Sequence, residues 1–194
     1  MALTTLDPNT ALIVVDLQKG MVNGDFIHPI AEVIDRTRTL IDVFRAKGLP
    51  VVLVNVAGRA PGRTEQGPRS SQTFAEGWTD LLPQLDQQPG DIAVTKRSWG
   101  AFATTELEAQ LKARGVTQVV VTGVVTSVGV EATARQAYEQ GFHVTLALDA
   151  MTDIREDAHQ YSIRSVFPRV GETGSTDEII SLLERPLRKG SSAS

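Results

Sequence analysis

The sequence predicts an α/β protein with three layers, a doubly wound parallel sheet and helices on both of its faces. Three observations lead to this prediction. Short, continuous apolar runs recur along the 194 residues, and such runs are typical of strands buried on both faces. Segments with apolar residues at helical spacing lie between these runs, and several end at a glycine. Strands that alternate with helices form parallel sheets joined by right-handed crossovers.

The strands are assigned from apolar runs that are short, rich in β-branched residues and bounded by turn residues. The first run ends in Asp16 and follows the turn residues Pro8-Asn9. In chain order the predicted strands cover residues 11–15, 50–56, 91–96, 118–123 and 143–149, and residues 169–171 are a candidate for a short sixth strand.

The helices are assigned from apolar residues at helical spacing and from glycines that follow their last turn. Thr105-Glu106-Leu107-Glu108 has the form of a capping box, which predicts a helix start there. Residues 57–90 are rich in Gly, Pro, Ser and Gln, and loops of that length often carry function. The predicted helices cover residues 30–47, 105–114, 128–140, 157–167 and 176–183.

Length and charge bound the class of protein. We expect one domain over residues 1–184, because domains most often contain about 100–200 residues, and a disordered tail over residues 185–194. The net charge of −4 argues against nucleic acid or an anionic membrane as a partner, since both require a concentrated basic face. No apolar run approaches the roughly 20 residues of a membrane span, and no secretory signal is visible at the N-terminus. The expected compartment is the cytoplasm.

The chain contains no cysteine, which excludes disulfides, thiolate nucleophiles, iron–sulfur ligation and thiolate zinc sites together. It also lacks a Gly-x-Gly-x-x-Gly after a strand and a phosphate-binding loop ending in Gly-Lys-Ser/Thr. Nucleotide binding by those routes is therefore not expected.

Two charged residues lie at the carboxyl ends of predicted strands, where doubly wound sheets place their active sites. Asp16 ends the first strand and Lys96 ends the third. Taken singly, Asp16 could cap a turn and Lys96 could be a surface lysine with a buried stem. Together they form a candidate acid–base pair, because a nearby ammonium orients a carboxylate and favours its charge. Asn55-Val56, Thr122-Gly123 and Asp149 are the other predicted carboxyl ends.

The segment from Gly123 to Ala134 leaves a strand and enters a helix. Helix N-termini present unpaired backbone N–H groups, so this turn could hold an anion or a developing oxyanion. The simpler interpretation is a strand-to-helix turn whose glycines satisfy the backbone geometry.

Four motifs along the chain resemble the isochorismatase-like hydrolase superfamily, which includes isochorismatases, nicotinamidases, N-carbamoylsarcosine amidases and related cysteine hydrolases. The resemblance runs from about Thr10 to Leu183. It implies a parallel, Rossmann-like sheet of six strands between two layers of helices. The motifs, in order, are Ala11-Leu12-Ile13-Val14-Val15-Asp16-Leu17-Gln18, Val94-Thr95-Lys96, Gly123-Val124-Val125-Thr126-Ser127-Val128-Gly129-Val130-Glu131-Ala132-Thr133-Ala134 and Ala147-Leu148-Asp149-Ala150.

The resemblance implies that Asp16 and Lys96 are two members of the family's catalytic triad. The third member is usually a nucleophilic cysteine, and Gly129 stands at that position. Without a thiol, an acyl-enzyme route has no nucleophile. The resemblance also implies a non-proline cis peptide at Val124–Val125, with the N–H groups of Val125 and Gly129 forming an anion hole.

True isochorismatases are similar in lacking this thiol. They cleave a vinyl ether by protonation and water attack, releasing pyruvate, which implies Asp16 as proton donor and Lys96 as the group that orients it or binds substrate. A proton donor needs a raised pKa, so burial or substrate carboxylates must outweigh the charge of Lys96. Two alternatives stay open. One is an amidase that uses activated water with Asp16 as base, and the other is a family member that binds a small molecule without turnover.

Val125-Thr126-Ser127 is closer to the cysteine-hydrolase pattern than to the Tyr-Ala-His-like run of isochorismatases. Three arginines in the long loop, Arg59, Arg63 and Arg69, could bind substrate carboxylates or simply belong to a solvated surface. Aromatic residues either wall the pocket or belong to the core. The candidates are Trp78, Trp99 and Phe102.

No metal or cofactor is expected. His28, His143 and His159 lie far apart in the sequence, and the stretch from Asn55 to Ala60 lacks the Asp-x-His-x-x-His-like ligand set of nicotinamidases. The expected partner is a small-molecule substrate. The resemblance further implies a homodimer or larger homo-oligomer.

Overall fold

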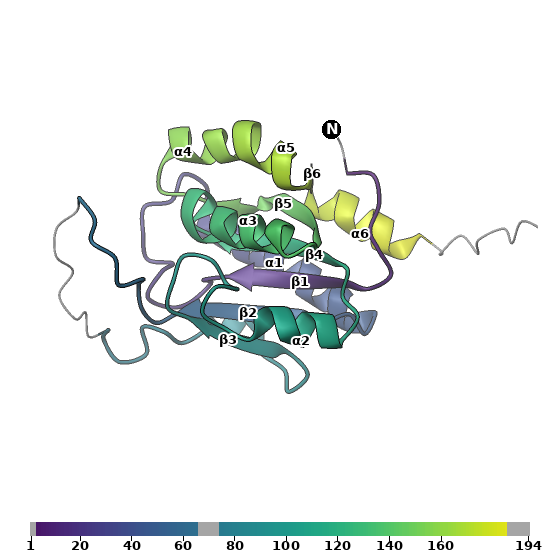
Figure 1. The fold of residues 1–194 in the computed structure, drawn as a ribbon, viewed down its shortest axis with the longest axis horizontal. Coiled ribbons are helices and arrows are strands. Elements are labelled where there is room, and N and C mark those ends of the chain that lie inside the picture. The colour runs from purple at the N-terminus through teal and green to yellow at the C-terminus, as the bar shows by residue number, and fades with distance from the viewer. Residues whose placement is uncertain (1–2, 66–73, 186–194) are drawn as a thin grey trace, which may run out of the picture.

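The computed structural model describes residues 3–65 and 74–185, and these form a six-stranded parallel sheet between two layers of helices (Figure 1). The sheet order is β3-β2-β1-β4-β5-β6. This confirms the predicted fold class, and the order reverses beside β1, where doubly wound sheets place their sites. The strands are β1 (Thr10–Val15), β2 (Val51–Val56), β3 (Ile92–Lys96), β4 (Gln118–Val124), β5 (His143–Thr152) and β6 (Glu172–Gly174).

Helices flank both faces of the sheet. None of the helices in the described part of the chain is long and apolar enough to cross a membrane. The α-helices are α1 (Ile30–Ala46), α2 (Leu107–Ala113), α3 (Glu131–Glu139), α4 (Glu156–Tyr161), α5 (Phe167–Val170) and α6 (Thr176–Glu184), with a 3-10 turn η1 (Pro83–Leu85) and π-helical turns η2 (Thr126–Val130) and η3 (Ser162–Val166).

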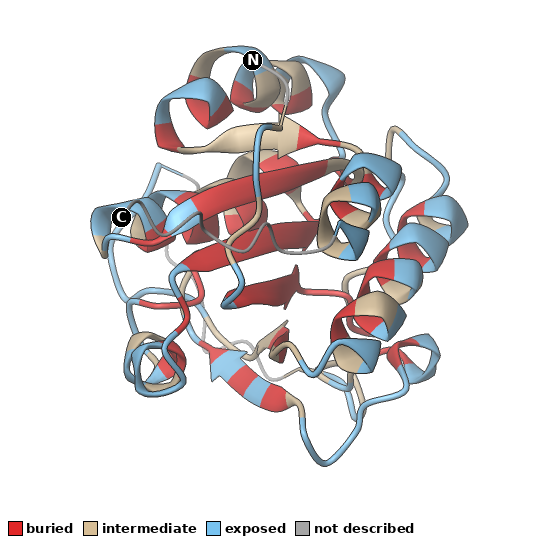
Figure 2. Ribbon diagram, turned by 90° about the vertical axis from the view of Figure 1, so that its right-hand side faces the viewer, coloured by how far each residue is buried: buried red, intermediate tan, exposed pale blue. Residues whose placement is uncertain are grey.

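Alternation along β1 creates two hydrophobic cores, one on each face of the sheet. Ile13 and Val15 pack with α2, α3 and α5 on one face, whereas Leu12 and Val14 pack with α1 and α6 on the other. Every residue of β1 is buried, as expected for the central strand of such a sheet. Figure 2 shows the buried strands between the helical layers. The sheet is therefore a rigid platform for side chains at its carboxyl edge.

The sixth strand lies three residues beyond the candidate at 169–171. Residues 167–170 form α5 instead, because Pro168 sits in its first turn, where the missing N–H costs nothing. The strand itself is β6, which pairs with β5.

Strand β5 extends beyond Asp149, so Asp149 does not mark a carboxyl end. The β4–β5 register shifts, since Leu146 pairs with Val121 while Met151 pairs with Gly123. Asp149 Oδ1 accepts hydrogen bonds from the backbone N–H of Thr176 (2.8 Å) and its hydroxyl (3.0 Å), and so supports the start of α6.

The predicted capping box at Thr105 does not form, because α2 begins only at Leu107 and its N-cap Glu106 makes no side-chain cap bond. A capping box exists elsewhere, between Ser175 and Glu178 at the start of α6. Of the predicted tail, only Arg185 belongs to the described residues.

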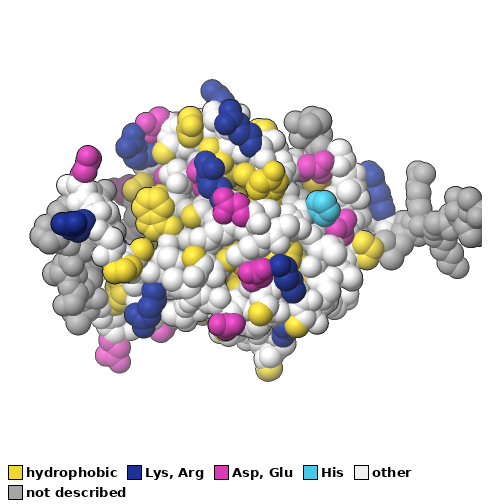
Figure 3. Space-filling model, in the orientation of Figure 1, with side chains coloured by type: hydrophobic (Ala, Val, Ile, Leu, Met, Phe, Trp, Pro, Cys, Tyr) yellow, Lys and Arg dark blue, Asp and Glu magenta, His cyan; other side chains and the backbone are white. Residues whose placement is uncertain are grey.

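Acidic and basic side chains are interspersed on the face shown in Figure 3. The absence of nucleic-acid and membrane partners, the single domain, the homo-oligomer and the cytoplasmic location remain predictions.

Candidate active site

Asp16 and Lys96 meet at the carboxyl edge of the sheet, although β2 lies between their strands. Lys96 Nζ is 2.8 Å from Asp16 Oδ2, and the two side chains are 1% and 6% exposed. Asp16 has a φ of 56°, a left-handed conformation that aspartate tolerates better than most residues. Its N–H still bonds to Val54 O, so the chain leaves the sheet abruptly just after β1.

The ammonium of Lys96 has a second partner, the carbonyl oxygen of Trp99. On the carboxylate, by contrast, Asp16 Oδ1 is buried and has no hydrogen-bond partner among the described residues. Burial raises the pKa of Asp16 to about 6, while the charge and hydrogen bond of Lys96 act to lower it. Burial thus outweighs Lys96, as a proton donor requires.

Gly129 borders this pair directly. A Cβ on Gly129 would lie 2.9 Å from Asp16 Oδ2 and 3.3 Å from Lys96 Nζ. Strand β4, which precedes this turn, approaches β1 even more closely, since a Cβ on Gly123 would lie 2.1 Å from Val15 O. Glycine at both positions lets the turn after β4 pack against the end of β1. The three predicted catalytic positions therefore form one cluster.

The turn that carries Gly129 contains the cis peptide Val124–Val125, as the resemblance implied. Val125 O accepts hydrogen bonds from the N–H groups of Val128 (3.1 Å) and Val130 (3.2 Å). Asp153, which the sequence did not single out, is 1% exposed, and its Oδ2 accepts the N–H of Ser127 at 2.7 Å. Asp153 therefore ties the end of β5 to the first turn of η2.

A cavity of about 430 Å³ opens over the pair. Asp16 and Lys96 form the floor of the cavity. Arg59 and Ser98 are the other charged and polar side chains among the described lining residues, and most of the wall is apolar. Phe74 and Trp78 stack in that wall with ring centroids 4.2 Å apart. The described residues that line it are Asp16, Met21, Val56, Gly58, Arg59, Phe74, Trp78, Lys96, Ser98, Trp99, Val125, Val128, Gly129 and Ile154.

Of the five predicted substrate-binding residues, Arg59 and Trp99 line this cavity, and their role in binding remains a prediction. Phe102 instead lies in the core, 3% exposed and 5.9 Å from Phe142 between ring centroids, because its loop folds back against α3. Arg63 is exposed and does not line the cavity, and Arg69 lies outside the described residues.

Two histidines that are distant in sequence come together beside this turn. The rings of His28 and His159 are 5.0 Å apart between centroids. Each makes a hydrogen bond through Nδ1, His159 to the Thr126 hydroxyl (2.9 Å) and His28 to the Thr152 hydroxyl (3.1 Å). Among residues 3–65 and 74–185, no three His, Asp or Glu side chains are grouped as metal ligands, and the absence of a metal remains a prediction.

Fold and site together define a doubly wound α/β protein with a buried carboxylate–ammonium pair beside a strand-to-helix turn. The family model of the isochorismatase domain matches residues 10–178. The chain belongs to the isochorismatase family and is a hydrolase of that family.

Similar proteins agree with this assignment. The uncharacterized isochorismatase family protein YwoC of Bacillus subtilis is 36% identical over 177 residues, covering 88% of this chain and 92% of that protein. A solved isochorismatase family structure from Burkholderia thailandensis has a TM-score of 0.88 and 36% identity, covering 93% of this chain and 98% of that one. Streptothricin hydrolase of Streptomyces noursei is 40% identical over 141 residues, covering 72% of this chain but 48% of that protein.

Proposed function

We propose that this protein hydrolyses a small, carboxylate-bearing enol ether of the isochorismate type, without a covalent intermediate and with release of pyruvate. The observation that carries the proposal is the carboxyl group of Asp16. It is buried, its Oδ1 has no hydrogen-bond partner in the described part of the chain, its pKa is raised to about 6, and it borders the backbone of Gly129. Such a group is half protonated at about pH 6, where an ordinary aspartate is almost fully ionised, and its protonated form can transfer the proton to a substrate.

The reaction balances with Asp16 and one water. Protonated Asp16 donates its proton to the terminal methylene carbon of the enolpyruvyl group, which leaves a cation at the ether-bearing carbon. Water adds there and returns a proton to the Asp16 carboxylate. The resulting hemiketal then breaks its C–O bond, giving an alcohol and pyruvate. Lys96, 2.8 Å from Asp16 Oδ2, stabilises the carboxylate while its proton is on the substrate.

The charges of the cavity suit an anionic substrate. When Asp16 is protonated and neutral, the ammonium of Lys96 gives the cavity floor a net positive charge. Arg59 adds a second cation on the wall. A substrate carboxylate held there raises the pKa of Asp16 further, which favours the proton donor. The apolar walls, including the Phe74–Trp78 stack, suit a carbon ring.

A second function is hydrolysis of an amide by a water that ionised Asp16 activates. The similarity to relatives named nicotinamidase 3 (Arabidopsis thaliana) and ureidoacrylate amidohydrolase RutB (Methylobacterium radiotolerans) favours it. The two functions predict opposite pH dependence, because one needs Asp16 protonated and the other needs it ionised. For the ether, kcat/KM declines as the pH rises above about 6, and for the amide it increases.

The test is to supply isochorismate and measure pyruvate for the wild type, Asp16→Ala and Asp25→Asn. Asp25 is an exposed carboxylate and serves as the control. We expect pyruvate from the wild type and Asp25→Asn only. No pyruvate from the wild type, or equal rates in Asp16→Ala, would overturn the ether proposal.

Amide substrates provide the second arm of the experiment. If they are cleaved, Asp16→Asn should abolish cleavage, and retained cleavage would exclude Asp16 as the base. Binding of benzoate without turnover of either substrate class, unchanged in Asp16→Ala, would instead support a binding protein.

A further inference from the structure

The loop between Arg97 and Thr105 sets the position of Lys96, because its Trp99 carbonyl oxygen accepts a hydrogen bond from the Lys96 ammonium. That ammonium also contacts Asp16. A shift of the Trp99 carbonyl therefore changes how closely Lys96 approaches Asp16.

Within the loop, side-chain hydroxyl groups connect successive residues. Ser98 Oγ donates to Gly100 O at 3.0 Å, and Thr105 Oγ1 donates to Ala101 O at 2.6 Å. The backbone N–H of Arg97 also reaches Thr104 Oγ1 at 3.4 Å. These bonds join residues on both sides of Trp99, so we expect a displacement of the loop to move the Trp99 carbonyl as well.

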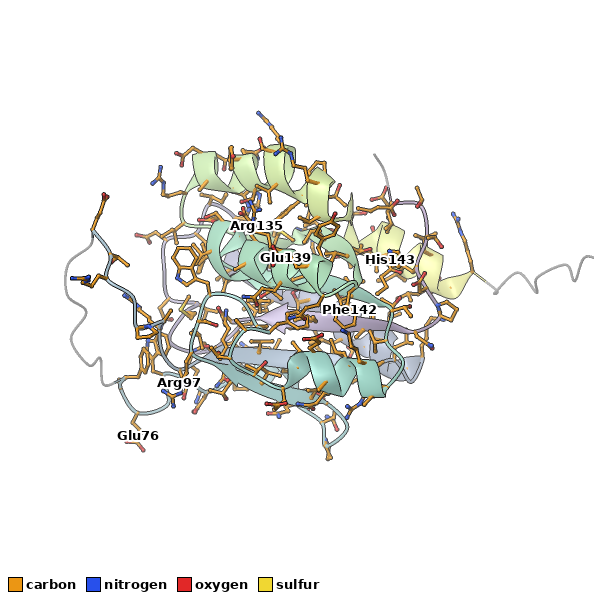
Figure 4. All side chains as sticks on the ribbon, in the orientation of Figure 1. Glu76, Arg97, Arg135, Glu139, Phe142 and His143 are labelled. Carbon is orange, nitrogen blue, oxygen red and sulfur yellow. The ribbon has the colours of Figure 1, made fainter. Side chains whose placement is uncertain are left out.

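Helix α3 anchors this unit through two side chains. Gln136 Oε1 accepts the backbone N–H groups of Phe102 at 3.0 Å and Ala103 at 3.3 Å. Thr133 Oγ1 accepts the N–H of Ala101 at 3.2 Å and donates to Gly129 O at 2.7 Å. Figure 4 labels Arg135 and Glu139 on the same helix. One helix thus contacts both the turn at Gly129 and the loop that holds Lys96.

Gly100 shows how closely the loop packs on this helix. A Cβ at Gly100 would lie 2.2 Å from Gln136 Oε1 and 2.6 Å from its Nε2. The loop backbone therefore rests directly against the Gln136 amide, and any side chain at position 100 would displace that amide. Gly100 is itself buried.

We propose that Gln136 is a positioning residue of the active site, which docks the loop at residues 97–105 on α3 and thereby holds the Lys96 ammonium against Asp16. The inference rests on the proposed function only in taking Asp16 as the reacting group. Lys96 and Arg59 are the charged side chains that line the cavity with Asp16 in the described part of the chain.

The experiment compares Gln136→Met, which keeps the side-chain length but cannot accept the two N–H bonds, with Gln140→Met. Gln140 follows four residues later, and its Oε1 has no partner within residues 3–65 and 74–185, so the same replacement there is a matched control. Gly100→Ala displaces the Gln136 amide without changing it and provides a second perturbation.

The readout is the titration of the Asp16 carboxyl carbon by NMR, assigned with Asp16→Asn. Weaker contact with Lys96 raises the midpoint, so we expect an upward shift of about 0.5 to 1 pH unit in Gln136→Met and Gly100→Ala and none in Gln140→Met. Hydrogen exchange at Phe102 and Ala103 should accelerate in the two shifted variants. An unchanged Asp16 midpoint in folded Gln136→Met, with faster exchange at those amides, would overturn the proposal.

This test needs no substrate, so its outcome is separate from that of the proposed function. With isochorismate, at a pH well below 6 where Asp16 is protonated in both proteins, Gln136→Met should lower kcat more than it changes KM, because Lys96 stabilises the Asp16 carboxylate that forms less well while the substrate walls stay in place. A change confined to KM would show that Gln136 acts on substrate binding instead, and would also overturn the proposal.

Discussion

Asp16 should make the protein less stable as the pH rises, and the size of the effect follows from its environment. Its pKa is raised from an ordinary value of 3.8 to about 6 in the folded protein, chiefly by burial. Between those values the folded state binds more protons than the unfolded state, so the free energy of unfolding decreases with pH. The stabilising contribution is complete below 3.8 and is lost as the pH rises through about 6.

The magnitude is about 3 kcal/mol over the full range, at about 1.4 kcal/mol per pKa unit, and about 2 kcal/mol between about pH 4.5 and 7.5. The assay is urea unfolding at both pH values for the wild type and for Asp16→Asn with Lys96→Met. The double variant removes both members of the pair, so that no buried ammonium is left without a partner. Groups that are present in both proteins, His159 among them, contribute equally to both and cancel.

The wild type should lose about 2 kcal/mol more than the double variant on going from the lower to the higher pH. Parallel pH dependence in the two proteins would refute the reasoning, because it would mean that Asp16 titrates alike in the folded and unfolded chains.

Three further predictions concern other parts of the molecule. Gly129→Ala places a Cβ 2.9 Å from Asp16 Oδ2 and should lower kcat/KM about 10- to 100-fold, whereas Gly90→Ala, which meets no neighbouring atom within 4 Å, should not; equal rates would contradict this. Burial, and next the charge of His28, lower the pKa of His159, so this group opposes the trend of Asp16 and removes stability as the pH falls below about 6.5; in urea titrations the wild type should therefore lose stability relative to His159→Gln over that range, and parallel curves would contradict this. Ser175→Ala should cost about 1 kcal/mol in urea unfolding, and an unchanged midpoint would exclude its capping role.

The fold and the central pair could be predicted from the sequence because both depend on local patterns. Buried parallel strands are continuous apolar runs, and their carboxyl ends share one edge of the sheet. Asp16 and Lys96 were found by that rule. The rule did not predict that the two side chains lie 2.8 Å apart, because this depends on their reaching each other past the carboxyl end of β2.

The residues that were placed wrongly or missed depend on tertiary contacts, which leave no local pattern in the sequence. Asp149 was placed at a strand end because the register shift between β4 and β5 is a property of the pairing. Phe102 was placed at the cavity because nothing in its neighbourhood indicates that the loop folds onto α3. Gln136 and Asp153 were missed for the same reason, since a polar residue that bonds backbone groups of another segment resembles any surface residue in sequence.

The environment of Asp16 bears on whether the site turns over a substrate. Asp16 has an oxygen with no hydrogen-bond partner among residues 3–65 and 74–185, and such a buried carboxylate costs stability at neutral pH. Its ion pair with Lys96 does not offset the burial, since the pKa stays raised. A residue needed only to support the fold would gain from a full set of hydrogen bonds, as the Asp153 carboxylate has with the N–H groups of Ser127, Ile154 and Arg155. Two buried aspartates at the same edge of the sheet therefore differ in kind. Asp16, which borders Gly129 and the cavity, makes fewer hydrogen bonds than Asp153 in the described part of the chain. This contrast favours a role in proton transfer over simple binding.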